Sequence, residues 1–378
     1  MTLHIDIPTR GQVDALFTSR NPSSVSVYLP TDPASAGQAE RIELKNLATE
    51  AERQLRDLKA ADSAVAEIAA AFADILDDET FWRYQARSLA LFVTPEALWT
   101  FRLPNQLVSL VQVSDRFHLK PLLRSITFPQ AAFVLALAEN SVRLLELVAG
   151  DSLPWVVTVP DLPVSAADAT GQPPDTGQAP RSKVRGSQGQ KLRLGQYTRQ
   201  IDRALRPVLG GLDVPLILAA AQPVDSMYRS ANSYPNLVTG SIPGNPEYTT
   251  DAELASAARS ILDHLRTDEL QASHELYQSR QSDGRVVQDI ADVARAATYG
   301  AVDTVFVDID EVIPGAIDEN TGAVTFSTAD DVASYGVVDE IARRVWLSGG
   351  RVLALRRADI PGQNSVAAIL RYTPMASA

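Results

Sequence analysis

Apolar residues recur with two different periods in the first third of the chain. Residues 24–30 form a mostly apolar run that ends in a proline, and they predict a strand, as do residues 89–93, 98–101 and 107–113. Between residues 37 and 76, apolar positions recur every three or four residues, which predicts a long helix that breaks into two near Asp62-Ser63. This pattern predicts an α/β block with its own core.

The middle of the chain is predicted to begin with three strands. They cover residues 133–137, 142–147 and 154–159, and the first two are joined by a hairpin turn at Glu139-Asn140-Ser141. Residues 160–180 are rich in Pro, Gly, Ala and Asp without apolar periodicity, which indicates a loop. Helical spacing resumes at Leu192 and continues to Leu209. The nearly all-apolar run 214–221 is typical of a strand covered on both faces.

The last third again alternates helices and strands. Helices are predicted over 251–265, 286–297 and 331–347, and strands over 302–307, 351–355 and 366–371. Such alternation indicates an α/β/α layer.

Composition narrows the class of protein. At 378 residues with 45% hydrophobic and 21% charged residues, the chain is an ordinary soluble globular protein of two or three domains. No apolar run reaches the roughly 20 residues that span a bilayer, and the first residues lack the apolar region of a secretory signal, so we expect a cytoplasmic protein. The absence of cysteine excludes disulfides, thiolate metal sites and a cysteine nucleophile.

One segment opposes the acidic charge of the whole. Residues 181–206, hereafter the basic segment, hold eight Lys or Arg residues and one acidic residue, Asp202. The chain is formally −12, so the rest of it sums to −19. Local positive charge on an acidic protein predicts a local anionic partner such as an RNA backbone, provided that these side chains are exposed. A solvated helix with a polar loop before it is the alternative.

Other candidate chemistry is weaker. Asp308, Asp310 and Glu311 follow a predicted buried strand, where a Mg²⁺ or phosphoryl-transfer site could lie, but a solvated loop explains them as well. The four histidines, His4, His118, His264 and His274, show no zinc-ligand spacing. Residues 81–87 and 228–234 mix aromatic and polar or basic side chains; they could stack on RNA bases, although a structural role is favoured.

Two strings in the last third resemble a known family. Residues 297–307, ATYGAVDTVFV, resemble the helix-to-strand turn in the C-terminal domain of the archaeal and eukaryotic class-one release factors and of pelota. Residues 365–372, SVAAILRY, resemble the strand that closes that domain. In the middle third, three strands, the string VPDLP at 159–163, a basic loop with Gly-Gln and a basic amphipathic helix resemble the family's middle domain. The chain is most similar to the bacterial relatives of these factors.

The resemblance implies an α/β fold with three α/β domains. Residues 1–126 would form an N-terminal α/β domain. Residues 127–248 would form an RNase H-like middle domain whose basic Gly-Gln loop spans 160–191. Residues 249–378 would form a kink-turn-protein-like α/β/α domain.

The chain departs from the family at the loop that gives these factors their activity. In the family, a Gly-Gly-Gln tripeptide enters the peptidyl transferase centre and helps water attack the peptidyl-tRNA ester. Here Gln188 stands before Gly189-Gln190, and a non-glycine residue at positive φ costs about 1–2 kcal/mol. The stop-codon-reading motifs of the release factors are also absent from the N-terminal block, so codon-dependent termination is not expected.

Three functions remain open from the sequence. The first is a translation factor that binds the ribosome, rRNA or tRNA in ribosome rescue, hibernation or stress, without a cofactor or membrane contact, and with a translational GTPase as a further partner. The second is a hydrolase of peptidyl-tRNA ester or RNA, with Gln190 as the catalytic residue. The third is an interaction module that has lost ribosome contact. The expected RNA-binding residues are Arg181, Lys183, Arg185, Gly186, Gln188, Gly189, Lys191, Arg193, Arg199 and Arg203.

Overall fold

The computed structural model describes residues 3–35, 37–128, 130–148, 153–170, 187–308, 311, 313–327 and 336–373, with the backbone alone at 187 and 188. Contacts group the chain into two compact units. Unit 1 comprises residues 1–5 and 129–265, and unit 2 comprises residues 6–128 and 266–378. The predicted N-terminal and C-terminal blocks thus share one unit, while the division of the chain into three domains stays a prediction.

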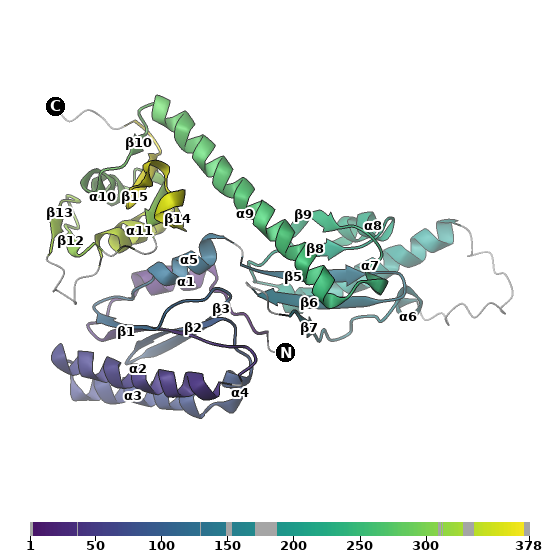
Figure 1. Cartoon of the computed structure of the whole chain (residues 1–378), viewed down its shortest axis with the longest axis horizontal. Coiled ribbons are helices and arrows are strands. Elements are labelled where there is room, and N and C mark those ends of the chain that lie inside the picture. Colours follow the sequence, from purple (N-terminus) through teal and green to yellow (C-terminus); the bar gives the residue numbers. More distant parts are fainter. Residues whose placement is uncertain are drawn as a thin grey trace. The chain divides into compact units, whose positions relative to one another are not determined.

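Unit 1 contains a five-stranded sheet in the order β7-β6-β5-β8-β9 (Figure 1). β5 pairs antiparallel with β6 and parallel with β8, and β8 pairs parallel with β9. In chain order this is third, second, first, fourth, fifth, with β6 alone running against the others, which is the RNase H-like arrangement that the resemblance implies. The strands are β5 (Ala131–Leu137), β6 (Val142–Val148), β7 (Trp155–Val157), β8 (Leu216–Ala219) and β9 (Leu237–Ile242).

Helices cover both faces of this sheet because alternate strand residues point to opposite sides. Ala132, Val134 and Ala136 of β5 pack with Leu254 and Ala258 of α9 (Asp251–Ser282). The intervening β5 residues are also fully buried, on the face that the remaining helices cover. These helices are α6 (Ala166–Ala169), α7 (Ser187–Leu209) and α8 (Val224–Ala231), and the short η2 (Pro246–Tyr248) precedes α9.

The N-terminal part of unit 2 is an antiparallel sheet in the order β3-β2-β1-β4. Val25, Val27 and Leu29 of β1 pack against α2 and α3, whereas Tyr28 points to the opposite face. The elements are α1 (Arg10–Thr18), β1 (Ser24–Pro30), α2 (Gln38–Asp57), α3 (Asp62–Asp77), α4 (Glu79–Arg83), β2 (Ser88–Thr94), β3 (Ala97–Leu103), β4 (Leu110–Ser114) and α5 (Lys120–Thr127).

The C-terminal part of unit 2 is an α/β/α layer, as predicted. Its sheet has the order β10-β15-β11-β14, with β11 and β14 parallel. Apolar residues of α10 and α11 pack on one face, and Tyr277 of α9 packs with Phe306 on the other. The elements are β10 (Val286–Val287), α10 (Ile290–Thr298), β11 (Val302–Asp308), β12 (Gly315–Ile317), β13 (Val324–Phe326), α11 (Val337–Leu347), β14 (Arg351–Leu355), η3 (Arg357–Asp359), η4 (Pro361–Gln363) and β15 (Val366–Leu370).

The two parts of unit 2 share one apolar core, which includes Phe117 and Leu122 from the first part and Val338 and Ile341 from the second. Polar contacts cross the same seam. Arg116 pairs with Glu340 at 2.7 Å, and the indole Nε1 of Trp346 donates to Asp14 at 2.6 Å. The N-terminal and C-terminal blocks, which residues 129–265 separate in the sequence, are therefore one packed body.

Several predicted elements have different bounds. α9 was predicted to end at residue 265 but continues to Ser282. The prediction was too short because the second half of the helix is mostly exposed and has few apolar residues to show a helical period. The predicted helix 286–297 is instead the strand β10 followed by α10. The structure describes the last predicted helix from Val337 onward. α1, α4, α5, β9 and the β12–β13 pair were not predicted, and α6 lies within the predicted loop 160–180. Each of these elements is short and depends on tertiary packing.

Candidate nucleic-acid interface

The basic segment places a row of cations on α7. Lys191, Arg199 and Arg203 are exposed, at spacings of eight and four residues, and so share one side of the helix. The opposite side, with Leu194, Tyr197, Ile201 and Leu205, is buried. Gly195 lies between Lys191 and Arg199, and a Cβ built there would meet nothing within 4 Å. We call Lys191, Arg199 and Arg203 the cationic face.

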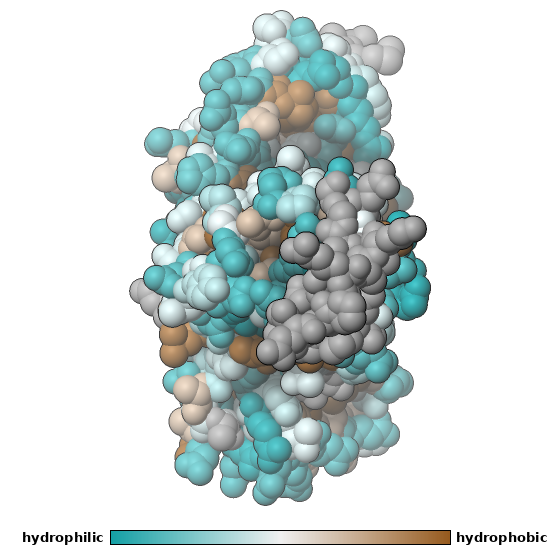
Figure 2. All heavy atoms as spheres, turned by 90° about the vertical axis from the view of Figure 1, so that its right-hand side faces the viewer, coloured by the Kyte–Doolittle hydropathy of each residue, from teal (hydrophilic) through white to brown (hydrophobic). Residues whose placement is uncertain are grey.

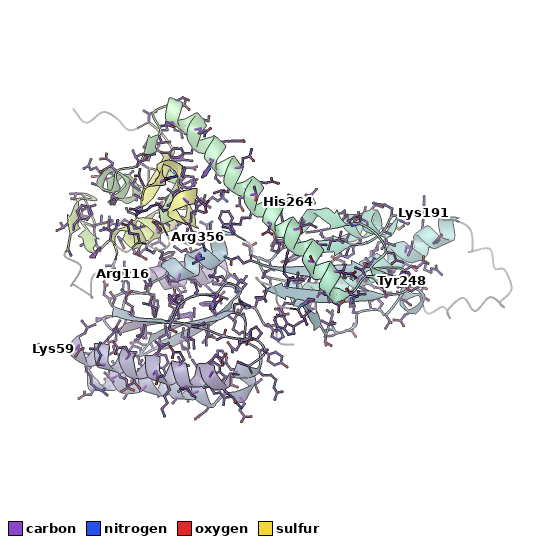
Figure 3. All side chains as sticks on the ribbon, in the orientation of Figure 1. Lys59, Arg116, Lys191, Tyr248, His264 and Arg356 are labelled. Carbon is purple, nitrogen blue, oxygen red and sulfur yellow. The ribbon has the colours of Figure 1, made fainter. Side chains whose placement is uncertain are left out.

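The helix begins earlier than its apolar spacing indicates. α7 starts at Ser187, so Gly189, Gln190 and Lys191 lie in its first turns rather than in the predicted loop. Figure 3 shows Lys191 at this end of the helix, pointing away from it. In Figure 2, which looks toward this end, the described side chains are mostly hydrophilic. Of the other predicted RNA-binding residues, Arg181, Lys183, Arg185 and Gly186 lie outside the described residues, and Gln188 is described by its backbone alone.

A carboxylate meets the start of α7. Glu139, in the turn between β5 and β6, accepts a hydrogen bond from Arg193 Nη2 and one at 3.4 Å from Gln190 Nε2. The side chains of Arg193 and Glu139 are each 33% exposed. Arg193 Nε is buried and has no hydrogen-bond partner among the residues that the structure describes. Arg193 is thus held by the protein, in contrast to the cationic face.

Main-chain contacts fix the turn that carries Glu139. The hydroxyl of Tyr197 donates to the Ala138 carbonyl at 3.1 Å, and the Ala166 amide donates to the Glu139 carbonyl at 2.9 Å. Burial, together with the negative charges of Asp168 and Glu139, raises the pKa of Tyr197, so its hydroxyl stays protonated and can donate. Hydrogen bonds therefore join the turn to α6 and α7 at the carboxyl end of β5.

A second carboxylate restrains the far end of the basic segment. Buried Asp202 accepts hydrogen bonds from Arg206 Nη2 at 2.7 Å and from the Ser233 amide at 2.7 Å. Arg206 and Arg193 are therefore paired. Within the part of the chain that the structure describes, no ion pair involves Lys191, Arg199 or Arg203, so the expectation of exposed cations is met at these three positions.

Asp308, the last residue of β11, and Glu311 are both paired with an arginine. Arg357 Nε donates to buried Asp308 at 3.0 Å, and Arg357 also pairs with Glu311, to which the Ser365 hydroxyl donates. The hydrogen bond and charge of Glu311, followed by those of Asp308, raise the pKa of Arg357. Asp310 lies outside the described residues. Among those described, no group of three acidic, His or Cys side chains is placed to hold a metal.

The aromatic-polar segments have structural roles. Trp82 is buried and its Nε1 donates to the Ile75 carbonyl at 2.8 Å. Tyr228 is fully buried, and the Tyr234 hydroxyl donates to the Leu212 carbonyl at 3.0 Å. The structural interpretation of residues 81–87 and 228–234 therefore holds for these side chains.

Comparison with known proteins finds a family match for most of unit 1. Residues 129–268 match the family model described as bacterial archaeo-eukaryotic release factor family 11. The match covers this segment alone. It contains Glu139, the whole of α7 and the cationic face, so the candidate interface lies in the release-factor-like segment. The resemblance expected from the sequence is confirmed. The comparison with curated proteins finds no match.

The solved structures that the comparison matches include three translation-related proteins. The crystal structure of the archaeal translation termination factor aRF1 is 14% identical, with 97% of this chain and 99% of that chain covered and a TM-score of 0.24. A model of ribosome-bound archaeal Pelota and ABCE1 is 14% identical, with 73% and 72% covered and a TM-score of 0.40. Dom34 of S. cerevisiae, a translation termination-like factor involved in RNA quality control pathways and interacting with Hbs1, is 13% identical, with 77% and 74% covered and a TM-score of 0.39. At these scores, the fold assignment rests on the chain's own sheets and helices.

Glu139 is the residue that sequence reasoning missed. It is visible in the sequence only as part of a hairpin turn, and its partner Arg193 lies 54 positions further on. In the described part of the chain, no helix is long and apolar enough to cross a bilayer.

Proposed function

We propose that this chain is a ribosome-associated translation factor that binds rRNA or tRNA through the cationic face of α7. The tasks that fit are the rescue of stalled ribosomes, the occupancy of idle ones, and a role in stress. The single observation that carries the proposal is the row of exposed cations on α7, a helix whose opposite side is buried and which lies within the release-factor-like segment.

The size and charge of the face suit a phosphate backbone. Lys191 and Arg203 are twelve residues apart, which is about 18 Å along a helix that rises 1.5 Å per residue. Three cations on such a length can each contact a phosphate of one RNA strand. Because the chain outside the basic segment sums to −19, the acidic remainder would repel RNA and confine the contact to this face.

Further partners follow from the family resemblance. The match of residues 129–268 supports a translation-related role. On the same ground we infer a cytoplasmic location and a translational GTPase as a second partner.

The test is pelleting with purified bacterial ribosomes over a series of salt concentrations. Replacing Lys191, Arg199 and Arg203 together by Gln should weaken binding and make its logarithm fall less steeply with the logarithm of salt, by about 2–3 in slope. The matched control carries the same loss of charge at exposed positions of unit 2, as Lys45→Gln, Lys59→Gln and Arg356→Gln (the last two positions are labelled in Figure 3). Equal binding by both variants would refute the proposal.

Hydrolysis of the peptidyl-tRNA ester is the second candidate, because the side chain of Gln190 is exposed at the start of α7. Release of peptide from peptidyl-tRNA on ribosomes by the purified protein, lost in Gln190→Ala, would support it. Binding without release would leave the RNA-binding function alone.

A further inference from the structure

The start of α7 already holds an anion, and that anion belongs to the protein. The two carboxylate oxygens of Glu139 are engaged by different groups: Oε1 by the guanidinium of Arg193 and Oε2 by the amide of Gln190 at 3.4 Å. A cation and a neutral donor directed at two oxygens of one anion are also the groups that bind a phosphate.

The pair is accessible and incompletely satisfied. Both side chains are one-third exposed, so solvent and a ligand can reach them. Arg193 Nε has no hydrogen-bond partner in the described structure, so the guanidinium has a donor that Glu139 does not use. This Nε is itself buried, so a phosphate could reach it only if the Arg193 side chain moves when Glu139 leaves.

We propose that Glu139 occupies the position of an RNA phosphate at Arg193 and Gln190, and so limits the affinity of the interface for RNA. This inference rests on the proposed function and adds a regulatory residue to the same site. When RNA binds at α7, a backbone phosphate displaces the Glu139 carboxylate and takes Arg193 as a fourth cation, on a different side of the helix from Lys191.

The position of Glu139 makes this exchange local. The turn is held by main-chain oxygens, those of Ala138 and Glu139, which accept from the Tyr197 hydroxyl and the Ala166 amide. The Glu139 side chain can therefore turn away, or be replaced, without loss of the contacts that fix the turn.

The variant Glu139→Gln keeps the shape of the side chain and removes its charge. If Arg193 becomes available, one more phosphate contact forms, so the slope of log K against log salt should steepen by about 0.7–0.9. Between 50 and 200 mM KCl such a change amounts to about a threefold larger loss of affinity, with tighter binding than the wild type at the low-salt end.

The experiment measures fluorescence anisotropy of a labelled RNA hairpin with a ten-base-pair stem, titrated with full-length protein at several KCl concentrations. Asp213→Asn is the matched control, because it removes the same charge from an exposed position just before β8. Since β5 and β8 are parallel, this position and the Glu139 turn lie at opposite ends of the strands. Arg193→Gln and the double variant Glu139→Gln/Arg193→Gln complete a cycle. We expect Glu139→Gln to bind more tightly at 50 mM KCl, Asp213→Asn to gain less, and the double variant to lose the gain.

The outcomes separate the two proposals. Wild-type binding with no change of affinity or slope in Glu139→Gln overturns this inference and leaves the RNA-binding function standing. A gain that persists in the double variant also overturns it, because Arg193 is then not the group released. If neither the wild type nor Glu139→Gln binds the hairpin or pellets with ribosomes, the proposed function itself is overturned.

Discussion

Replacing Glu340 by Ala tests the packing of the two halves of unit 2 against each other. The Glu340 carboxylate is 8% exposed and accepts from three guanidinium groups: Arg116 at 2.7 Å, Arg343 at 3.1 Å and Arg344 at 2.8 Å. Arg116 belongs to the N-terminal part, whereas the other three residues lie on α11. A single buried anion therefore pairs with two arginines of its own helix and, across the seam, with Arg116.

Removal of that anion leaves the three cations without their shared partner. Breaking a buried ion pair from one side costs about 3–5 kcal/mol. Because Arg116 keeps Asp115 as a partner at 3.0 Å, we expect the loss to lie toward the lower end of this range. Arg20 is a further cation close to this cluster. Burial is the largest cause that lowers the pKa of Arg20, the charges of Arg343 and Arg116 lower it further, and the charge of Glu340 raises it, so the loss of Glu340 removes a favourable interaction from Arg20 as well. In a unit of this size each kcal/mol shifts the midpoint by about 2–4 °C, so we expect a drop of roughly 6–20 °C.

Differential scanning calorimetry of the full chain measures this drop. Glu340→Gln, which keeps an acceptor oxygen, should lose less than Glu340→Ala. The exposed ion pair between Glu50 and Arg53 on α2 supplies the control, and Glu50→Gln should leave the midpoint unchanged. If Glu340→Ala melts within 1 °C of the wild type, the carboxylate does not hold the seam and the reasoning is wrong.

Three further outcomes are expected. Burial lowers the pKa of His118, the charge of Lys120 lowers it further, and the charge of Asp339 opposes this. The unfolded chain therefore binds the proton more readily than the folded one, so the stability of the protein should fall as pH drops below about 6.5. Thermal melts at pH 5–8 should show a flatter dependence of stability on pH in His118→Gln. Gly37→Ala should destabilise unit 2, since φ is +81° there and the new Cβ would lie 2.7 Å from Trp82 Cβ; an unchanged melting midpoint would contradict this. Phe133→Ala in the core of unit 1 should lower the free energy of unfolding by about 3–5 kcal/mol. It should shift the calorimetric transition of unit 1, which Glu340→Ala in unit 2 leaves in place; a shift of the same transition by both variants would show that the units unfold together.

Elements with strong local patterns could be predicted from the sequence. The apolar runs of β5, β11 and β15 and the three-to-four-residue spacing of α2 and α3 specify their own secondary structure. The second half of α9 could not be predicted, because an exposed helix carries few apolar residues to mark its period. The joining of N-terminal and C-terminal parts into one core depends on contacts such as that of Arg116 with Glu340, 224 positions apart, which leave no local signal.

The candidate site was predictable in charge and not in geometry. The positive residues of α7 predict an anion-binding surface, and their helical spacing already indicates which of them share a side. The sequence could not show that Arg193 and Arg206 are restrained by Glu139 and Asp202 while three others are exposed. Nor could the sequence show that Gly189 and Gln190 lie in a helix, because glycine is typical of loops and these residues adjoin a segment without apolar periodicity.

A cryo-electron map of ribosomes isolated with the tagged protein would test the RNA-binding role of α7 most directly. We predict density for unit 1 with the side of α7 that carries Lys191, Arg199 and Arg203 within hydrogen-bond distance of an rRNA or tRNA backbone. A map in which the protein is bound but this side of α7 faces solvent, or in which no density for the chain is present, would contradict the proposal.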